Sequence, residues 1–170
     1  MKLDEAQLFK IAKKFRQAIE KTDFSVDKVG LEANLRMKKF PVESCTHICS
    51  ILGAYLTSEY KLQPLLEVHA HIDDEKGLFA FHRWLEHDGI IIDITADQFA
   101  MIKTPVIVSR DSSFHKQYAK VISFYSDKFD INYEQYLLNL YDAVTATLKR
   151  IEKKYALFKK LIKLIKKNNK

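Results

Sequence analysis

Three residue types that can together carry out nucleophilic catalysis occur in two segments near the middle of this chain. Cys45 ends the segment Phe-Pro-Val-Glu-Ser-Cys at residues 40–45, and His82 and Asp93 flank an Asp-Gly pair. A thiol becomes a strong nucleophile when a nearby imidazole takes its proton, and a carboxylate can hold that imidazole in the required orientation. These segments can therefore supply all three groups that an activated cysteine needs.

The Asp88-Gly89 pair predicts a β-hairpin that brings His82 and Asp93 together. Both flanking runs are rich in aromatic and aliphatic residues, and Asp-Gly between such runs is typical of a two-residue turn. The numbers of paired residues then sum to 177, as those of Asp88 and Gly89 do, so that His82 faces Thr95 and Trp84 faces Asp93. Residues two apart share a face of the sheet, which makes His82 and Asp93 diagonal neighbours, about 7–8 Å apart at the backbone.

A helix is predicted to begin at Ser44 and to hold Cys45 in its first turn. Pro41 disfavours helix just before it, serine is a good N-cap, and apolar residues follow at helical spacing. These apolar residues are Ile48, Ile51, Leu52, Tyr55 and Leu56. The unpaired N–H groups and the positive dipole end of a helix start favour thiolate, and the same N–H groups can bind the oxyanion of an acyl-transfer intermediate.

The order Cys, His, Asp, with the cysteine at a helix start and the other two on adjacent antiparallel strands, resembles the papain-like and transglutaminase-like cysteine enzymes. The run His-Arg-Trp-Leu-Glu-His-Asp-Gly-Ile-Ile-Ile-Asp-Ile-Thr-Ala-Asp-Gln-Phe is similar to a bacterial branch of that superfamily, and the likeness covers about residues 40–115. On this resemblance Cys45 is the nucleophile, His82 the general base and Asp93 the residue that orients it. The further candidates for oxyanion binding or for lining the substrate are Ser44, Trp84 and Gln98.

The expected fold is α+β: a papain-like or transglutaminase-like core of N-terminal helices and a small antiparallel sheet, followed by a long C-terminal helix. Hydrophobic periodicity predicts helices and strands in that order. The helices are expected at 3–20, 44–58 and 133–167, and the strands at 65–72, 78–86, 89–95 and 105–109. Because the chain has 170 residues, 47% of them hydrophobic, and no linker, we expect a single domain over 1–170, with its core at about 20–130.

Other residues near the candidate site have simpler structural interpretations. Cys49 is expected to be structural, because a redox pair normally has two residues between its cysteines. Trp84 and Phe99 are expected in the core rather than on a substrate platform. Asp97 is expected to cap a turn, and His115 to lie on a loop or short helix, at the surface or beside the cleft.

The histidine pair His69 and His71 suggests a metal site as an alternative. Both imidazoles would lie on one face of a strand, with acidic residues at 73–75 close behind, and such groups can hold zinc or iron. The run from Asp73 to Gly77 is explained better as the solvated turn of a hairpin. We therefore expect no metal and no cofactor.

The sequence favours a cytoplasmic setting. Its first residues are charged and lead into an amphipathic helix rather than a secretory signal. No apolar run reaches the roughly 20 residues of a membrane span. Two cysteines without such a signal indicate a reducing compartment, where a thiol nucleophile stays usable.

The C-terminal helix combines a heptad seam with most of the positive charge. Its apolar residues alternate steps of four and three: Leu137, Tyr141, Val144, Leu148, Ile151, Tyr155, Phe158, Ile162 and Ile165. From Lys149 to Lys170 ten Lys or Arg residues stand against one acid, a net of +9 in a chain of net +6. The stripe either packs on the N-terminal helix and the body, or pairs with a partner helix or second copy through 137–165, or meets an anionic membrane or nucleic acid. Nucleic acid is not favoured, because no aromatic residues interleave with basic ones as in a binding groove.

The leading hypothesis is a cysteine-dependent hydrolase or acyltransferase. It would attack an amide or ester carbonyl of a peptide or protein, form an acyl-enzyme on Cys45 and pass the acyl group to water or an amine, with peptidase or amidase ahead of other transfer. Loss of Cys45 or His82 should abolish turnover, while Asp93→Ala should lower turnover and leave folding largely intact. The alternative is a non-catalytic binding module of papain-like fold whose C-terminal helix docks a partner.

Overall fold

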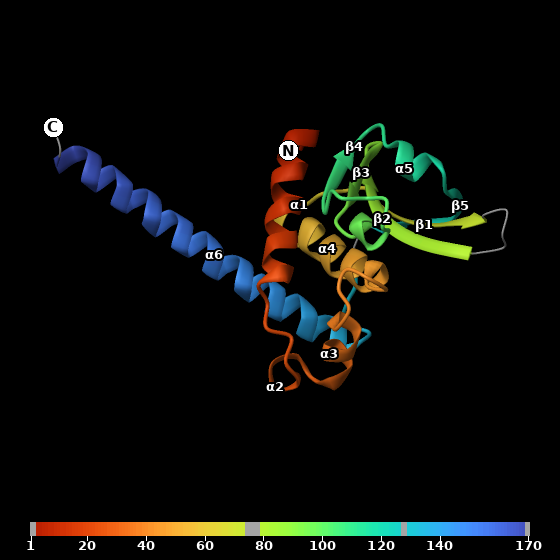
Figure 1. The fold of residues 1–170 in the computed structure, drawn as a ribbon, viewed down its shortest axis with the longest axis horizontal. Coiled ribbons are helices and arrows are strands. Elements are labelled where there is room, and N and C mark those ends of the chain that lie inside the picture. Colours follow the sequence, from red (N-terminus) through yellow and green to blue (C-terminus); the bar gives the residue numbers. More distant parts are fainter. Residues whose placement is uncertain (1–2, 74–78, 127–128, 169–170) are drawn as a thin grey trace.

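A layer of helices packs against an antiparallel sheet, and one helix extends beyond both (Figure 1). The computed structural model describes residues 3–73, 79–126 and 129–168. The predicted α+β class is confirmed, together with the small antiparallel sheet and the long C-terminal helix.

Helix α1 spans Glu5–Glu20, which agrees with the helix predicted at 3–20. The Asp4 carboxylate accepts a hydrogen bond from the Gln7 backbone N–H at 2.8 Å, and the Gln7 side chain accepts one from the Asp4 N–H at 2.9 Å. This reciprocal pair caps the first turn. The apolar side of α1 is buried through Leu8, Ile11, Phe15 and Ile19.

Helix α4 spans Cys45–Tyr60 and confirms the helix predicted at 44–58. It is buried on several sides, and at Gly53 the ring of Phe129 occupies the place that a β-carbon would take. Two short helices that the sequence did not reveal, α2 (Val26–Val29) and α3 (Leu31–Met37), precede it. Helices this short are too brief to show a helical period.

The sheet has five antiparallel strands in the order β4-β3-β2-β1-β5. The strands are β1 (Leu65–Asp73), β2 (Phe79–His87), β3 (Ile90–Asp93), β4 (Ile107–Ser109) and β5 (Ala119–Ser126). The first four confirm the predicted strands, with β3 shorter than expected, whereas β5 and the short helix α5 (Ser113–Lys116) were missed. The acidic turn predicted between β1 and β2 lies, except for Asp73, outside the described residues.

The predicted hairpin register is confirmed where β2 and β3 pair, whereas the predicted pairs His82–Thr95 and Trp84–Asp93 lie beyond the end of that ladder. Leu85 pairs with Ile92 and His87 with Ile90, and both pairs sum to 177. Asp88 and Gly89 have φ values of 49° and 73°. Two consecutive positive φ values are those of a type I′ turn, which matches the twist of the strands that it joins.

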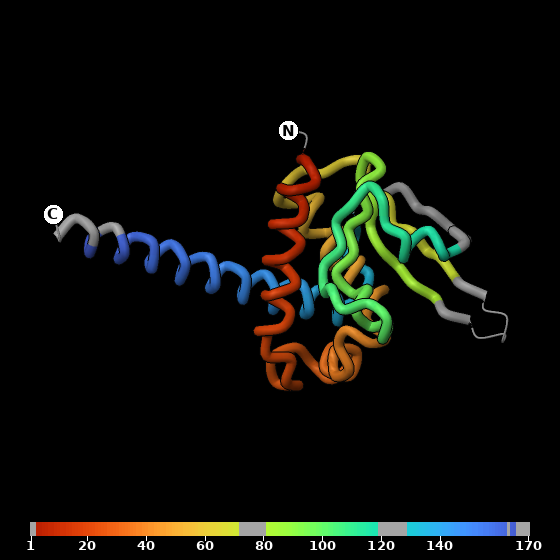
Figure 2. Tube along the Cα trace, turned by 45° about the horizontal axis from the view of Figure 1, so that its top comes forward, coloured from red at the N-terminus to blue at the C-terminus, as the bar shows by residue number. Residues whose placement is uncertain are grey.

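The two faces of the sheet carry two hydrophobic clusters, and alternate residues of β2 contribute to each. Leu85 belongs to the larger cluster, with α1, α4 and the first half of α6 (Figures 1 and 2). Trp84 belongs to the smaller cluster on the other face, with Phe114 of α5 and Tyr118. Because side chains alternate between faces along a strand, the neighbours Trp84 and Leu85 lie on opposite faces of the sheet and in different clusters.

Helix α6 spans Gln135–Asn168 and agrees with the helix predicted at 133–167. Its first half is buried through Leu137, Leu140, Val144 and Leu148. Beyond the ion pair between Glu152 and Lys14 of α1, at 3.0 Å, α6 projects away from the body (Figure 2). The alternative that the apolar stripe packs on the body is therefore correct for the first half of the heptad seam. It is wrong for the second half. No helix among the described residues has an apolar stretch long enough to cross a membrane.

Candidate active site

The hairpin brings His82 and Asp93 into direct contact. Nε2 of His82 lies 2.6 Å from Oδ2 of Asp93, and both side chains are buried. The diagonal pairing expected from the hairpin register is thus present in the structure. It places an imidazole and a carboxylate together inside the protein.

Asp93 is held as an anion by four hydrogen bonds. Oδ1 accepts from the Thr95 backbone N–H at 2.8 Å and from the Thr95 hydroxyl at 3.2 Å. Oδ2 is shared by Nε2 of His82 and, at 3.0 Å, Nε2 of His115. Burial by itself raises the pKa of this carboxyl, but the charges and hydrogen bonds of the two imidazoles outweigh burial and hold its pKa well below the usual range.

His115 is the site residue that sequence reasoning placed least well. It is buried on α5, where Oγ of Ser112 lies 2.7 Å from its Nδ1, and its Nε2 reaches Asp93. His115 therefore joins the N-cap serine of α5 to the buried carboxylate. The serine three residues before the histidine, at the N-cap of a short helix, is the sequence signal that accompanies it.

Cys45 is the first residue of α4 and is partly exposed beside His82. Burial raises the pKa of its thiol, but a hydrogen bond from His82, the imidazolium charge, the Arg83 backbone N–H and the Gln98 amide bring the pKa below its ordinary value. Burial likewise lowers the pKa of His82, but Asp93 and Cys45 raise it to about 9. The two shifts act together, because each partner favours the charged form of the other, a thiolate on Cys45 and an imidazolium on His82.

Cys45 lies beside the part of β2 that β3 does not pair with. β3 pairs with β2 only from Leu85 to His87, so His82 and Arg83 lie beyond that ladder and line the same cleft as Cys45. The backbone N–H of Arg83 is one of the groups that lower the pKa of Cys45. Since Nε2 of His82 contacts Asp93, the ring nitrogen on the other side is Nδ1, which also lies 3.0 Å from Nε2 of Gln98.

Ser44 precedes α4 as expected, but its predicted role as a side-chain cap is wrong. Its Oγ donates to the Pro41 carbonyl at 2.7 Å and makes no capping hydrogen bond. The side chain is buried and engaged there, which does not support oxyanion binding by its hydroxyl. Because no serine cap competes for them, the N–H groups of the first turn of α4 remain suited to an anion.

Gln98 lies in the site and Trp84 lies beneath it. Nε2 of Gln98 is 3.0 Å from Nδ1 of His82 and donates to the Thr95 carbonyl at 3.2 Å. Trp84 is fully buried, donates to Glu86 at 2.9 Å and packs its ring 4.7 Å from that of His115. Trp84 is thus a core residue, as expected, and is not among the residues that line the cleft.

Aromatic rings enclose His82. Those of Phe99, Phe114 and Tyr118 have centroids 5.2, 5.9 and 5.9 Å from the imidazole. Burial raises the pKa of Tyr118 above its ordinary value, and the charges of Asp93 and Cys45 add to the rise. These rings exclude water from the ion pair, which strengthens its electrostatic interactions.

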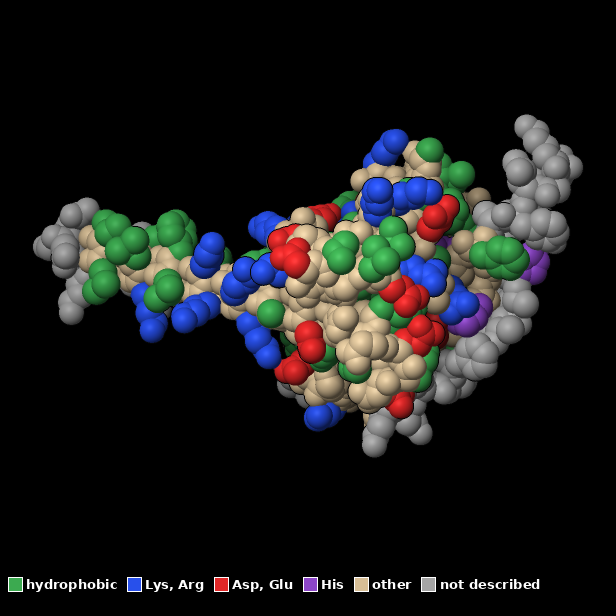
Figure 3. Space-filling model, turned by 90° about the horizontal axis from the view of Figure 1, so that it is seen from below, with side chains coloured by type: hydrophobic (Ala, Val, Ile, Leu, Met, Phe, Trp, Pro, Cys, Tyr) green, Lys and Arg blue, Asp and Glu red, His purple; other side chains and the backbone are tan. Residues whose placement is uncertain are grey.

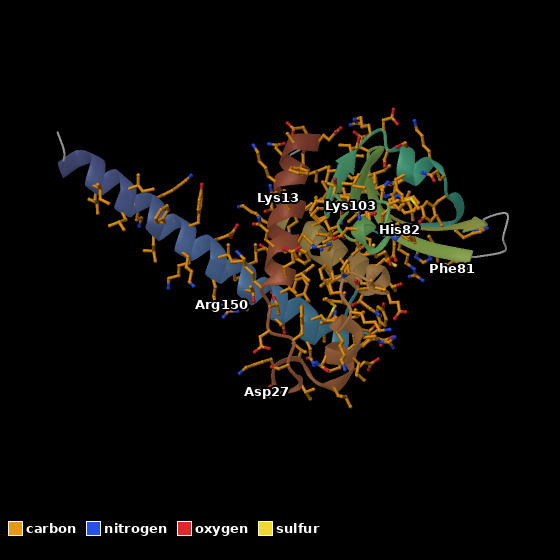
Figure 4. The ribbon with its side chains drawn as sticks, viewed as in Figure 1. Lys13, Asp27, Phe81, His82, Lys103 and Arg150 are labelled. Carbon is orange, nitrogen blue, oxygen red and sulfur yellow. The ribbon has the colours of Figure 1, made fainter. Side chains whose placement is uncertain are left out.

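A cleft of about 280 Å³ opens beside Cys45 and His82. Its lining is Cys45, Thr46, His69, Ala70, Phe81, His82 and Arg83. Phe81 is 70% exposed and lies nearer the start of β2 than His82, which is surrounded by side chains (Figure 4). Glu67 accepts from Arg83 at 3.2 Å and lies 2.9 Å from Nε2 of His69, so one wall of the cleft is a charged network.

Cys49, one helical turn after Cys45, is buried. Burial raises the pKa of its thiol well above the ordinary value. Its structural interpretation agrees with this position, and the cysteines are not bridged.

A metal could be held by His82, Asp93 and His115, whose ligand atoms lie within 4.8 Å of one another. Two imidazoles and a carboxylate suit zinc or non-haem iron. Both Nε2 atoms, however, are within hydrogen-bond distance of the same carboxylate oxygen, and each must lose its proton before it can bind a metal. The alternative metal site at His69 and His71 is not supported. His69 contacts Glu67, and the acidic residues 74 and 75 lie outside the described part of the chain.

Arg16 of α1 ties together the segments that carry the site. Its Nη1 and Nη2 each donate to the Asp97 carboxylate at 2.8 Å, and Nη1 also donates to the Ile94 carbonyl at 2.6 Å. Its guanidinium also lies 4.4 Å from the ring centroid of Phe40, in the segment that leads to Cys45. The sequence-based expectation that Asp97 caps a turn is therefore wrong. Its side chain instead anchors the turn after Asp93 to α1.

Arg16→Met is expected to destabilise the protein by about 3–5 kcal/mol, because it leaves a mostly buried Asp97 carboxylate and a buried carbonyl without their donor. Thermal unfolding should show a fall in Tm of about 10 °C. Arg36→Met is the matched control, since Arg36 is half-exposed, pairs with the exposed Glu32 at 3.3 Å and lies 5.7 Å from the ring centroid of Tyr136. Arg36→Met should change the free energy of unfolding by no more than about 0.5 kcal/mol. Equal Tm shifts in the two variants would contradict the structural role of Arg16.

The described residues define an α+β protein in which a cysteine at a helix start meets a buried His-Asp pair on a hairpin. No protein-family model, no curated protein and no solved structure matches the chain.

Proposed function

We propose that this protein is a thiol enzyme of papain-like or transglutaminase-like type, a cysteine-dependent hydrolase or acyltransferase that acts on an amide or ester carbonyl. The observation that carries the proposal is the placement of His82 between the other two groups. Its Nε2 contacts Asp93 at 2.6 Å, and its opposite side interacts with the sulfur of Cys45. An imidazole held in this way can keep the thiol ionised and then move a proton.

The first half of the reaction forms an acyl-enzyme. The Cys45 thiolate attacks the carbonyl carbon and forms a C–S bond, and the carbonyl π electrons move to oxygen. The resulting oxyanion lies near the first-turn N–H groups of α4 and the Gln98 amide, which can donate to it. As the tetrahedral intermediate collapses, Nδ1–H of the His82 imidazolium protonates the leaving amine or alkoxide, and a thioester remains on Cys45.

The second half of the reaction releases the acyl group. Neutral His82 takes a proton from water or from an acceptor amine, the resulting nucleophile attacks the thioester, and the Cys45 thiolate leaves. His82 is then again an imidazolium that Asp93 stabilises. The buried carboxylate stays ionised throughout, because both imidazoles hold its pKa low.

The cleft favours a small acyl donor or a single side chain of a peptide. Its volume of about 280 Å³ is just below the usual range of small-molecule sites, about 300–1,000 Å³. Phe81 can pack against an apolar group, and Arg83 and His69 can donate hydrogen bonds. Within this proposal, peptidase or amidase chemistry is the first choice, ahead of other acyl transfer.

The experiment is acyl-enzyme trapping with p-nitrophenyl acetate, a small activated ester that fits this cleft. Wild-type protein is expected to release nitrophenolate over many turnovers and to carry an acetyl group on Cys45, as read by mass spectrometry. Cys45→Ala should do neither. An added primary amine that takes the acetyl group at the expense of water would identify a transferase.

Cys49→Ala is the matched control, because Cys49 is a buried thiol on the same helix, one turn from the site. It should keep both turnover and acetylation. Full turnover in Cys45→Ala, or acetylation of wild type at sites other than Cys45, would reject the proposal. The binding-module alternative would then take its place, with Cys45 as a structural thiol.

A further inference from the structure

The outer part of α6 carries apolar side chains that no other part of the described chain covers. We call residues 153–168 the tail helix. Its apolar face consists of Tyr155, Leu157, Phe158, Leu161, Ile162, Leu164 and Ile165, all exposed and all but Ile162 more than half exposed. In Figure 3 this part of α6 is a rod with apolar and basic side chains and no visible acidic one beyond the body.

The apolar face is wider than a heptad seam. At about 100° per residue, its members occupy about half of the helix circumference. Leu157, Leu161 and Leu164 lie beside the seam positions and widen it. A pairwise coiled coil buries a narrower stripe, so the width favours a broad apolar surface over a single partner helix.

The charges of the tail helix have one sign. Every charged residue from Lys153 to Lys170 is a lysine. Lys153, Lys159 and Lys160 are exposed on the side opposite the apolar face, while Lys154 lies on the apolar side at its inner end. Nζ of Lys159 lies 4.8 Å from the ring centroid of Tyr155, so its aliphatic stem follows the edge of the apolar face.

We propose that the tail helix binds in the plane of an anionic membrane surface. The apolar face would enter the boundary between headgroups and acyl chains, with the lysines at the level of the lipid phosphates and carboxylates. The charge pattern selects this occupant. Two copies of the tail helix would bring lysines together with no acid among them to pair with, whereas anionic headgroups supply the opposite charge.

The test is co-sedimentation of the full chain with vesicles of phosphatidylcholine containing about a quarter phosphatidylserine, compared with phosphatidylcholine alone. Binding is expected only to the anionic vesicles and is expected to weaken as salt rises from about 0.1 M to about 0.5 M. The emission of Phe158→Trp should shift to the blue on binding. The other tryptophan, Trp84, is buried and should give a constant background.

Two double variants separate the contribution of the lysine charges to vesicle binding from that of the apolar side chains. Lys159→Gln with Lys160→Gln should weaken binding roughly 30-fold, at about fivefold for each lysine. Phe158→Ser with Leu161→Ser should weaken it by about 100-fold or more. The matched control is Leu31→Ser with Leu35→Ser on α3, where two leucines are as exposed as those of the tail, and it should change binding by less than about twofold.

Several results would overturn the proposal. One is equal binding to neutral and anionic vesicles, and another is vesicle binding that survives the Phe158 and Leu161 substitutions. A third is the absence of vesicle binding together with a dimer in analytical ultracentrifugation that the same double variant dissociates, which would make a second copy the occupant.

Discussion

His82→Ala is expected to lower the alkylation rate of Cys45 at pH 7 by up to about 30-fold. The reason is that the imidazolium of His82 lowers the pKa of Cys45, whereas an ordinary thiol is only about 3% ionised at that pH, so that complete ionisation sets the upper limit of the effect. The rate is measured with iodoacetamide and read by mass spectrometry on the separate peptides. Cys49 serves as the internal control, because its buried thiol should react slowly in every variant.

His87→Ala is the matched substitution on the same strand. His87 is buried too, but its Nδ1 donates to the Pro64 carbonyl at 2.8 Å and has no part in the site. Loss of this histidine should therefore leave the Cys45 rate within about twofold of wild type. If His87→Ala slows Cys45 as much as His82→Ala does, the effect is one of folding and the assignment of His82 fails.

The same measurement across pH separates the ionisations. The wild-type alkylation rate should stay near its plateau well below pH 8, because the pKa of Cys45 is lowered, whereas the rate in His82→Ala should follow an ordinary thiol. Turnover should also fall as the pH rises through about 9, where His82 loses the proton that it gives to the leaving group. Such a bell-shaped profile is expected only if both groups act in the reaction.

Asp93→Asn should lower turnover by about 10³-fold or more, since an amide neither stabilises the imidazolium nor fixes its orientation. The structure also changes the sequence-based expectation that removal of this carboxylate leaves folding largely intact. Asp93 is buried and accepts from Thr95, His82 and His115, so we expect a loss of about 3–5 kcal/mol in unfolding free energy. Urea unfolding measures that loss, and an unchanged midpoint would contradict it.

The pH dependence of stability provides a second test of Asp93. Its folded-state pKa lies below that of the unfolded chain, so its contribution is present above about pH 4 and is lost as the pH falls further. The pKa of His82 is raised to about 9, so its contribution is complete below about pH 6.5 and is lost as the pH rises through 9. In Asp93→Asn, the free energy of unfolding should depend less on pH at both the acidic and the alkaline end. Asp111→Asn is the control, because Asp111 is exposed and paired with Lys116, and it should keep the pH dependence of the wild type.

Local sequence signals predicted the elements that carry the site. Asp88-Gly89 can adopt the positive φ values of a type I′ turn, and this single turn sets the register that joins His82 to Asp93. Pro41 and the apolar spacing after it placed Cys45 at a helix start. In both cases the determining residues lie within a few positions of the element that they fix.

The missed features depend on contacts between distant segments. Arg16 lies among the buried apolar residues of α1, and a charged residue on such a face signals a buried partner without identifying it as Asp97. His115 reaches Asp93 only after α5 and the sheet have packed together. The hydroxyl of Ser44 donates to the Pro41 carbonyl and makes no capping hydrogen bond to α4.

The heptad seam illustrates a different limit. A period tells which face of α6 is apolar but not where the surface that covers it ends. The first half of α6 meets α1 and α4, and the same period continues for about 24 Å beyond them. The size of the rest of the protein decides how much of the seam is covered. The periodicity of one helix carries no information about that size.

The burial of Cys49 determines how this protein would respond to peroxide. Peroxides oxidise thiolates, so Cys45 is the sulfur that would become a sulfenic acid. Cys49 is close in sequence, but its buried, protonated thiol cannot act as the resolving cysteine that converts a sulfenic acid into a disulfide. Recovery of oxidised Cys45 would therefore depend on an external thiol such as glutathione. Without such a thiol, further oxidation to the sulfinic acid would inactivate the site permanently.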